Sequence, residues 1–415
     1  MPTPDPTPTV QHPPAWLRAV NRILGVPARA AAFPSLGDAP TLMATARRKA
    51  GLDDFGDAGF QVGVETLLRS LESDVRPTPV GQLVLRGTLV GYLVNRLRIV
   101  ESARRDPTID ELPVPRPLFV VGLSRTGTTL LHNLLALAPE ARAPRTWELL
   151  TPAPSCAPGE PCERRRVART RRQLRMLYAA APALRVVHPI EALDAEECYP
   201  LLNHTFVSPA FGMHYGVPSY WDWVTRAPRE RTRRAYEEYR TQLQILQHRH
   251  PPRRWVLKSA THLPGLASLL DVFPDAMIVQ THRELRRTLP SLCSMVACFR
   301  NLVFPECPPA ALGRECLERA NAVLSAGRAA RDGHPPERFL DITYDELTRD
   351  PLAQVTRIHR HFGLDFSPAH QDAARRWLEA HPPHQDGIHR YSMAQFGLDD
   401  DAIAATLGPS GHGAS

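Results

Sequence analysis

One stretch constrains the fold of this chain more than any other, the run LFVVGLSRTGTTLLHNLLALA that begins at Leu118. Its first part, Leu118–Leu123, is a short apolar run, which is typical of a strand covered on both faces in a parallel sheet. The polar stretch SRTGTT follows, and the apolar spacing of LLHNLLALA then predicts a helix. The run therefore indicates a strand, a glycine-containing loop and a helix in succession.

Three further strand–helix units follow along the chain. Strands are expected at 253–259, 276–283 and 338–344, and helices near His262–Phe273, Leu285–Ala297 and Pro351–Phe362. Alternating strands and helices predict an α/β fold with a doubly wound parallel sheet, flanked by helices and joined by right-handed crossovers.

The rest of the chain divides by composition. Residues 1–14 contain six prolines and predict a disordered leader, and 15–113 predict a helical region with apolar residues at helical spacing. The α/β domain is expected over 114–398. It includes a long, irregular, aromatic-rich insertion at about 144–252 that we expect to act as a substrate cap. Residues 399–415 are expected to form a flexible tail.

The overall composition excludes several classes of protein. With 43% hydrophobic residues in 415, the chain can form a sizeable core, which excludes wholesale disorder. No apolar run approaches the ~18–20 residues that span a bilayer, and no secretory signal is visible. Seven cysteines are an odd number, and Cys156 and Cys162 have no Cys/His pair to complete a zinc site. We therefore expect a reduced cytoplasmic protein without a transmembrane segment.

The chain is basic, with a net charge of +7, and lysine occurs only at Lys49 and Lys258 among 50 basic residues. If arginine replaces lysine wherever either serves, a retained lysine indicates a need for its compact ammonium, which points to Lys258. The densest basic cluster, at Arg164–Arg175, fits either a solvated helix face or an anion-binding surface. Because no motif for reading nucleic acid accompanies this charge, we expect no nucleic-acid partner.

The loop after the first strand has the spacing of a phosphate-binding loop, Gly122-x4-Gly127. An anion is favoured there by the free N–H groups at the start of the helix, and Thr128 and Thr129 add hydroxyl donors. A tight turn between strand and helix is the structural alternative. A nucleoside-triphosphate loop needs lysine where Thr128 stands, and Phe339–Asp341 is a poor substitute for a metal-holding acid. The pattern therefore favours a single 5′-phosphate group with its substituent.

The run PLFVVGLSRTGTTLLHNLLA resembles the 5′-phosphosulfate loop of sulfotransferases that use 3′-phosphoadenosine 5′-phosphosulfate (PAPS). It is most similar to the bacterial branch with an arginine in this loop. The resemblance extends from about Phe55 to Leu398 through the blocks LVNRLR, WELL, WVLKSATHL, FPDAMIVQTHR, ITYDELTRDP and HRYSMAQFGLD. It departs from the family at Ser124 and Ala260, where proline is usual, and at Glu284-Leu285, where Asp-Pro is usual.

The resemblance implies a set of donor-binding residues. PAPS is the implied co-substrate, without a metal, and its 5′ end is held by the loop residues Arg125, Thr126, Gly127, Thr128 and Thr129. The matching family residues imply that Arg283 and Ser291 hold the 3′-phosphate and that Tyr344 lies near the adenine. Arg390 lies in the block that matches the C-terminal 3′-phosphate segment.

The implied catalytic groups are Arg125 and Lys258, because a cation stabilises the negative charge that develops on the bridging oxygen of the leaving phosphate. Two residues are candidates for the general base. Glu148 in TWELL matches a catalytic glutamate of some branches, and His262 in KSATHLP is similar to the KTHLP of others. Each has a structural alternative, Glu148 as a partner of arginine and His262 as a residue at a helix start. His188 is a third, weaker candidate.

We therefore predict a sulfotransferase that moves a sulfuryl group from PAPS to a hydroxyl or amine of a small-molecule, glycan or lipid acceptor. Two other classes compete with it. A P-loop kinase or NTPase-like enzyme is disfavoured by Thr128 and by the missing metal-binding acid. A non-catalytic nucleotide-binding protein would have no reason to keep Lys258 together with Arg125.

Overall fold

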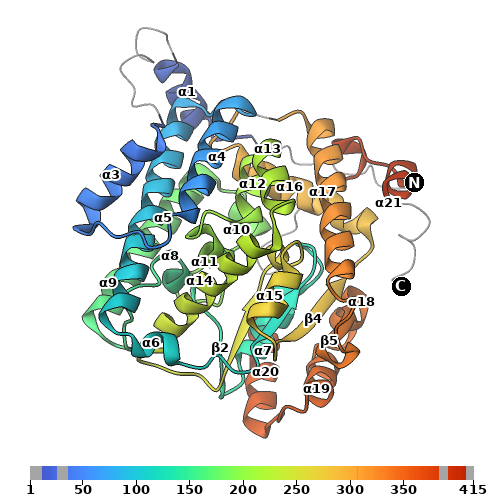
Figure 1. Cartoon of the computed structure of the whole chain (residues 1–415). Helices are drawn as coiled ribbons and strands as arrows, with labels where there is room; N and C mark the ends of the chain where they lie inside the picture. Colours follow the sequence, from blue (N-terminus) through green and yellow to red (C-terminus); the bar gives the residue numbers. More distant parts are fainter. Residues whose placement is uncertain (1–11, 26–35, 306, 383–390, 408–415) are drawn as a thin grey trace.

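A computed structural model of the chain describes residues 12–25, 36–305, 307–382 and 391–407 (Figure 1). Five parallel strands form one sheet in the order β2-β3-β1-β4-β5. Their bounds are Leu118–Val121 for β1, Ala141–Arg142 for β2, Arg254–Lys258 for β3, Met277–His282 for β4 and Phe339–Thr343 for β5. The doubly wound parallel sheet predicted from the sequence is confirmed.

Strand β1 lies at the centre of this sheet. Leu118 is in register with Val256 of β3 on one side and with Met277 of β4 on the other. All four β1 residues are buried, as expected for a strand covered by helices on both faces. Because the chain continues to opposite sides of β1, the carboxyl end of this strand is the switch point where α/β sheets bind ligands.

The four strands predicted from apolar runs are all present, and the helix expected at Pro351–Phe362 is α19 with those bounds. Its ends are set locally. The Asp350 side chain accepts a hydrogen bond from the Ala353 N–H, and Gly363 closes the helix with φ of 62°. Strand β2 was not predicted, because two half-buried residues at a sheet edge carry no periodic signal.

The predicted N-terminal helical region is present on the left of Figure 1. It comprises α1 (Ala15–Leu24), α3 (Ala39–Ala50), α4 (Gly59–Ser73), α5 (Pro79–Arg105) and α6 (Thr108–Glu111). Leu85, Leu89, Leu93 and Leu97 recur every four residues along α5 and are fully buried or nearly so, so that this long helix forms one wall of the main core.

The insertion at about 144–252 is more regular than its sequence suggested. It folds into helices α8 (Thr146–Leu150), α9 (Pro161–Ala180), α10 (Leu184–Val187), α11 (Tyr199–Asn203), α12 (Pro209–Tyr215), α13 (Pro218–Thr225) and α14 (Arg229–Gln247). Prolines at the first turns of four of these helices had obscured the periodicity, although such positions tolerate proline. The aromatic side chains of Phe206, Phe211 and Tyr220 pack together in the core.

The remaining helices lie after the strands of the sheet. They are α7 (Thr128–Ala136), α15 (Leu266–Val272), α16 (Leu285–Arg300), α17 (Pro309–Ala329), α18 (Tyr344–Arg349), α20 (Pro368–Ala380) and α21 (Asp400–Leu407). The expectation of a flexible tail from residue 399 is wrong for α21, which buries Ile403 and packs on α16 and α17. Residues 408–415 and the first eleven residues of the expected leader lie outside the described part of the chain.

The cysteines correct a second expectation. Cys156 and Cys162 form a disulfide, with their Cα atoms 6.2 Å apart, so the chain is not fully reduced in this structure. The intervening residues include Pro158 and Gly159, and Gly159 has φ of 81°, which allows the short loop to turn back on itself. The five remaining cysteines are free.

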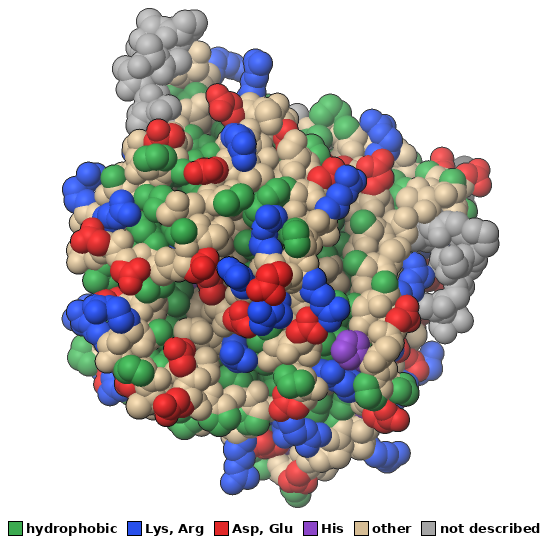
Figure 2. Space-filling model, viewed as in Figure 1, with side chains coloured by type: hydrophobic (Ala, Val, Ile, Leu, Met, Phe, Trp, Pro, Cys, Tyr) green, Lys and Arg blue, Asp and Glu red, His purple; other side chains and the backbone are tan. Residues whose placement is uncertain are grey.

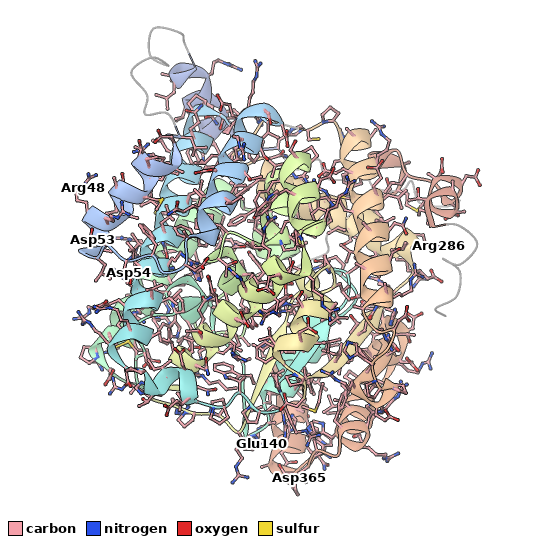
Figure 3. All side chains as sticks on the ribbon, in the orientation of Figure 1. Arg48, Asp53, Asp54, Glu140, Arg286 and Asp365 are labelled. Atoms are coloured by element: carbon pink, nitrogen blue, oxygen red, sulfur yellow. A yellow bond between two sulfur atoms is a disulfide. The ribbon has the colours of Figure 1, made fainter. Side chains whose placement is uncertain are left out.

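The surface carries charges of both signs. Figure 2 shows basic and acidic side chains interspersed across one face of the molecule. Labelled side chains such as Arg48, Asp53, Arg286 and Asp365 lie at the margins of the molecule (Figure 3). Among the helices of the described residues, none is long and apolar enough to cross a bilayer.

Candidate active site

The phosphate loop joins β1 to α7 at the switch point. Arg125 has φ of 77° and Gly127 has φ of 90°, so the backbone turns sharply before α7 begins at Thr128. A Cβ atom on residue 127 would lie 2.8 Å from the Leu347 side chain, which explains the glycine. The N–H groups of the first turn of α7 lack partners within the helix and are a site for an anion.

The threonines of this loop have different surroundings. Thr126 is buried, and its hydroxyl lies 2.6 Å from both the Leu123 carbonyl and the Thr281 hydroxyl, so it braces the loop from inside. Thr128 is also buried, as the first residue of α7. Thr129 is exposed and lines the cavity described below, where its hydroxyl can meet a ligand.

Arg125, Arg283, Ser291 and Tyr344 form one connected group. The Arg125 Nε donates to Ser291 Oγ at 3.0 Å, and one Arg283 amino group donates to the Arg125 carbonyl at 3.0 Å. The Arg283 guanidinium lies 3.9 Å from the centre of the Tyr344 ring. Ser291 is fully buried and reaches the group only through Arg125.

This group retains an unused donor. The Arg283 Nε is buried and has no hydrogen-bond partner within the described residues. A buried N–H group without a partner is costly, and a phosphate oxygen would satisfy it. Burial lowers the pKa of Arg125, and the nearby Arg283 charge lowers it further. An anion between these arginines would relieve both effects.

The site opens into a large cavity of about 1390 Å³ that runs along α7. Its walls include residues of the loop and of α7, of β2 and α8, and of the segment before Glu196, among them Arg125, Thr129, Arg142, Glu148, Asp194, Arg283, Tyr344 and Tyr391. Typical ligand pockets measure ~300–1,000 Å³, so this space has room for a nucleotide and a second substrate together.

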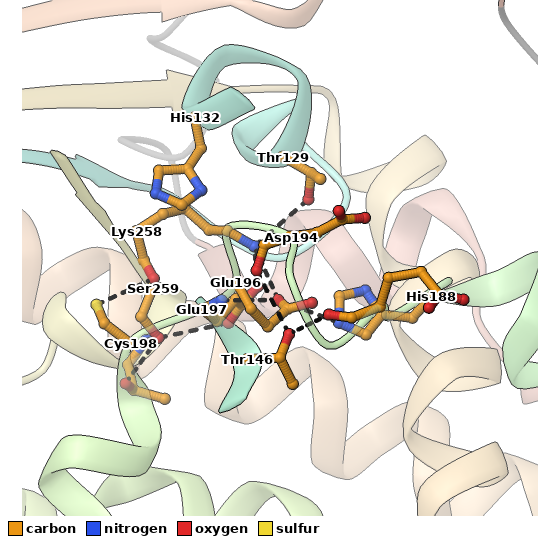
Figure 4. Close-up of polar contacts among 12 residues, drawn as sticks. Thr129, His132, Thr146, His188, Asp194, Glu196, Glu197, Cys198, Lys258 and Ser259 are labelled. Carbon is orange, nitrogen blue, oxygen red and sulfur yellow. Dashed lines mark hydrogen bonds and ion pairs between the residues drawn. The ribbon is translucent and has the colours of Figure 1, made fainter. Parts of the chain in front are cut away.

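Lys258 ends β3 beside the phosphate loop and is 1% exposed. Its ammonium donates to Thr129 Oγ1 at 3.4 Å and to Glu197 Oε1 at 3.0 Å (Figure 4). A second carboxylate, that of Glu196, lies 3.6 Å away. Burial alone would lower the pKa of Lys258, but Glu197 and Glu196 together hold the pKa above its ordinary value. The ammonium therefore stays charged.

The two acids beside Lys258 were not predicted from the sequence. They lie in the irregular segment between α10 and α11, and Glu196 is also 3.5 Å from His188 Nε2 (Figure 4). Burial acts to raise the pKa of Glu196, but His188 and Lys258 outweigh it and lower that pKa. The pattern gave no signal for them, because the pair Glu237–Glu238 on α14 looks the same in sequence but contacts Arg233 and Arg96.

Glu148 lines the cavity, and both of its carboxylate oxygens have partners. Oε1 accepts from the Arg142 guanidinium, and Oε2 accepts from the Arg145 backbone N–H at 2.9 Å. The second contact belongs to the start of α8, where Glu148 is the third helical residue. The contact with Arg142 fits the structural role that the sequence left open for Glu148, that of a partner for arginine.

His262 does not lie on the cavity. Its Nε2 is 3.1 Å from the Cys198 sulfur, its Nδ1 is 3.0 Å from the Tyr236 hydroxyl, and the rings of Phe119 and Tyr239 enclose it. Burial lowers the pKa of His262 to about 3. The ring is fully buried and does not line the cavity, so the geometry argues against His262 as the general base. Arg390 lies outside the described residues.

A scan of protein families matches residues 117–368 to the model described as "Sulfotransferase family". Among curated proteins, the chain is similar to the omega-hydroxy-beta-dihydromenaquinone-9 sulfotransferase Stf3 of Mycobacterium bovis and Mycobacterium tuberculosis. The identity is 26% over 311 residues, which cover 73% of this chain and 75% of the relative.

Solved structures give the same result. The sulfotransferase STF1 from Mycobacterium tuberculosis H37Rv is 30% identical, with a TM-score of 0.80, covering 90% of this chain and 99% of its own. The sulfotransferase STF9 from Mycobacterium avium also has a TM-score of 0.80, covering 89% of this chain and 95% of its own. At 24% identity, STF9 shows the similarity of the fold alone.

Proposed function

The chain belongs to the sulfotransferase family, and from this premise we propose that it moves a sulfuryl group from PAPS to a hydroxyl group on an apolar small molecule. It is a sulfuryl-transferring enzyme, and the family implies PAPS as the sulfate donor. The identity of the acceptor and the roles of individual residues are the parts that we propose.

For the donor, we assign the 5′-phosphosulfate to the loop residues 125–129 and the 3′-phosphate to Arg283. The free Arg283 Nε and the unpaired N–H groups at the start of α7 support this placement. Ser291 acts by holding the Arg125 side chain, and the Tyr344 ring packs against the Arg283 guanidinium. Arg390 is assigned to the 3′-phosphate on the sequence resemblance alone.

The observation that carries the proposal is the position of the Lys258 ammonium between Thr129 of the loop helix and Glu197. In the transfer, the acceptor oxygen bonds to sulfur while the bond from sulfur to the bridging oxygen breaks. Negative charge develops on adenosine 3′,5′-diphosphate, the leaving group. Lys258, together with Arg125, stabilises that charge, and a preorganised cation in a buried site does this effectively.

We propose Glu197 as the base that takes the acceptor proton. It is the carboxylate nearest to Lys258, and its Oε1 loses its cationic partner when the ammonium turns to the leaving oxygen. Glu148, the candidate from the sequence, lines the cavity, but Arg142 and the Arg145 N–H occupy both of its oxygens. Glu148 remains the alternative base, and the two roles are separable by experiment.

For the acceptor, the similarity to Stf3 favours a lipid, because the name of that enzyme specifies a hydroxylated dihydromenaquinone. The large cavity along α7 offers space for such a molecule beside the donor, and Leu130, Leu137, Trp147 and Val186 contribute apolar surface to it. We therefore propose a primary alcohol with an apolar tail as the acceptor, in preference to a glycan.

A paired measurement tests the base. Glu197→Gln and Glu148→Gln enzymes are compared for turnover of PAPS with a panel of apolar alcohols, and products are identified by mass. Removal of a general base lowers kcat by ~10²–10⁴, so we expect that loss in Glu197→Gln. Binding of adenosine 3′,5′-diphosphate, measured by calorimetry, should change little in either variant.

Glu148→Gln is the matched control, since it also removes a single carboxylate charge and concerns the other candidate base. We expect it to lower the melting temperature, because Arg142 loses its buried partner, and to keep most of the turnover. Turnover near wild type in Glu197→Gln, with a large loss in Glu148→Gln, would reverse the assignment.

A further inference from the structure

Helix α9 carries an unusual concentration of one charge. Its twenty residues include seven arginines, at positions 164, 165, 166, 169, 171, 172 and 175, and one acid, Glu163 in the first turn. No acid follows along the helix to offset the arginines. The N-terminus of α9 lies at the rim of the cavity, because Glu163 and the preceding Pro158 line it.

The arginines lie mainly on the outer face. Val167, Thr170, Leu174 and Tyr178 recur at helical spacing and are buried against the body of the protein. Arg165, Arg169, Arg172 and Met176 recur at a spacing of three or four residues on the opposite side, and all four are exposed. A stripe of three guanidinium groups that ends in a thioether therefore faces solvent, with Arg175 beside it.

These arginines lack acidic partners, in contrast to those of another surface helix. On α14, Arg233 pairs with Glu230 and Glu237, and Arg234 pairs with Glu230. Within the described ranges, the side chains of the exposed arginines of α9 form no hydrogen bond and no ion pair. These arginines are Arg165, Arg169, Arg171, Arg172 and Arg175. The face therefore presents uncompensated positive charge.

The positive field extends to the neighbouring helix α5. Burial lowers the pKa of Arg98, and repulsion from Arg169 lowers it further. Arg166 behaves likewise, with burial as the larger cause and repulsion from Arg98 and Arg165 as the smaller. Like charges held together in this way are costly without a counter-charge. An anionic partner on the outside would remove that cost.

Met176 adds an apolar element to this surface. Its side chain is 68% exposed, the largest value among the exposed large hydrophobic side chains of the described residues. It is one helical turn from Arg172 and adjacent to Arg175. A basic helix face that also presents an exposed apolar side chain has the character of a helix that lies on a membrane surface.

We propose that the outer face of α9, defined by Arg165, Arg169, Arg172, Arg175 and Met176, binds an anionic membrane surface. The arginines contact lipid phosphates, and Met176 enters the boundary between headgroups and acyl chains. Because α9 starts at the rim of the cavity, this contact brings the cavity to the bilayer. The surface is separate from the transfer chemistry and does not depend on the identity of the acceptor.

A membrane fits this face better than nucleic acid does. Single-stranded nucleic acid is bound by aromatic platforms between basic residues, and α9 has one aromatic residue, Tyr178, which is buried against the protein. The exposed Met176 side chain would gain nothing from a phosphate backbone, whereas the edge of an acyl layer would bury it. A partly apolar, uniformly cationic face is therefore matched by an anionic bilayer.

The test is co-sedimentation of the full chain with vesicles. Vesicles of phosphatidylcholine alone are compared with vesicles that contain phosphatidylglycerol, at low and high salt. The variant replaces four arginines by glutamine, at positions 165, 169, 172 and 175. Each basic residue at an anionic surface contributes ~1 kcal/mol, or roughly fivefold in partitioning, so the variant should lose roughly several hundredfold. Salt should weaken wild-type binding.

The matched control removes the same charge elsewhere, with glutamine at the exposed arginines Arg314, Arg328, Arg357 and Arg360 of α17 and α19. We expect this control to bind vesicles nearly as wild type does, and Met176→Ser to weaken binding by a few fold. Turnover with a water-soluble alcohol should be unchanged in the α9 variant, which separates a failure of docking from a failure of the enzyme assignment.

Several results would overturn the proposal. Equal losses in the α9 variant and in the control would assign binding to net charge. Absence of binding to phosphatidylglycerol vesicles would exclude the membrane contact. Binding of duplex or single-stranded DNA that depends on the four α9 arginines, without vesicle binding, would assign the face to nucleic acid.

Discussion

The two sides of Lys258 are built in different ways. On the side that we assign to the donor, called the donor side below, a contiguous loop supplies Arg125 and Thr129, and the ends of β4 and β5 add Arg283 and Tyr344. On the opposite side, Glu196 and Glu197 come from the insertion. Glu197 contacts Lys258, which lies 61 residues later in the chain, and Ser259, which lies 62 residues later. The donor side follows from the order of strands, loops and helices, whereas the acid side depends on how a long helical excursion folds back.

This difference determines what each side can contribute. Parallel strands place their carboxyl ends at one edge, so any donor-binding residue that follows a strand is brought to the same place. The acid side is held by contacts that no motif describes, such as the Cys198 N–H donating to the Lys258 carbonyl at 2.9 Å. We infer that recognition of the donor is set by the sheet and that proton removal is set by the insertion.

The sharpest way to break the comparison is to remove the residue that joins the two sides. Lys258→Met should lower kcat by ~10²–10³, the loss seen when one donor to a developing negative charge is removed, with a smaller change in Km for PAPS. Lys258→Arg should rescue only part of the loss, because a planar guanidinium cannot place a point charge on the bridging oxygen.

The measurement is steady-state turnover together with calorimetric binding of adenosine 3′,5′-diphosphate. If Lys258→Met weakens that binding as much as it lowers kcat, the ammonium acts in ground-state binding and not in the transition state. Wild-type turnover in Lys258→Arg would remove the argument from lysine usage.

The donor side alone is tested by Arg283→Ala. Loss of a charge-assisted hydrogen bond costs ~1.5–3 kcal/mol, so binding of adenosine 3′,5′-diphosphate should weaken by roughly 10- to 150-fold. Binding of adenosine 5′-phosphate, which lacks the 3′ group, should change little in the same calorimetric titration. If the affinities for the two nucleotides fell by similar factors, Arg283 would contact a part of the donor other than its 3′-phosphate.

The position of His262 is tested by the pH dependence of stability. Its pKa is lowered to about 3 in the folded chain, against ~6.5 unfolded, so the unfolded state binds one more proton between these values. This group therefore removes stability as pH falls from ~6.5 towards 3, by ~1.4 kcal/mol per pH unit at most. Above pH ~6.5 it contributes no slope.

In His262→Asn, which does not titrate, the free energy of unfolding from urea titrations should fall less steeply between pH 6 and about 4 than in wild type. The variant is expected to be less stable at pH 7, so the slope and not the absolute value is the measurement. An unchanged slope would mean that His262 can be protonated in the folded chain, which would return it to the list of possible bases.

The fold and the gathering of the loop and strand-end residues at one edge of the sheet were predictable because their signals are local. Four buried strands, the glycine pair of the loop and the cap of α19 each depend on residues close in sequence. The acid side was not predictable, since Glu196 and Glu197 share their pattern with a pair on α14. His262 was misplaced for a related reason, because its Cys198 and Tyr236 partners are distant in sequence and enclose it in the core.

The smallest expected effect separates the two threonines of the loop. Thr129→Val removes a hydroxyl that lies 3.4 Å from the Lys258 ammonium, a long contact, so kcat should fall by roughly two- to tenfold, within the ~0.5–1.5 kcal/mol of a typical hydrogen bond. Thr126→Val is the matched control. It removes two buried contacts of 2.6 Å inside the loop and should lower the free energy of unfolding by ~1–3 kcal/mol. Turnover assays and urea titrations of both variants measure the difference. If Thr126→Val lowers kcat without lowering the free energy of unfolding, then both threonines act in turnover. The distinction between a threonine that faces the ligand and one that stabilises the loop would then be wrong.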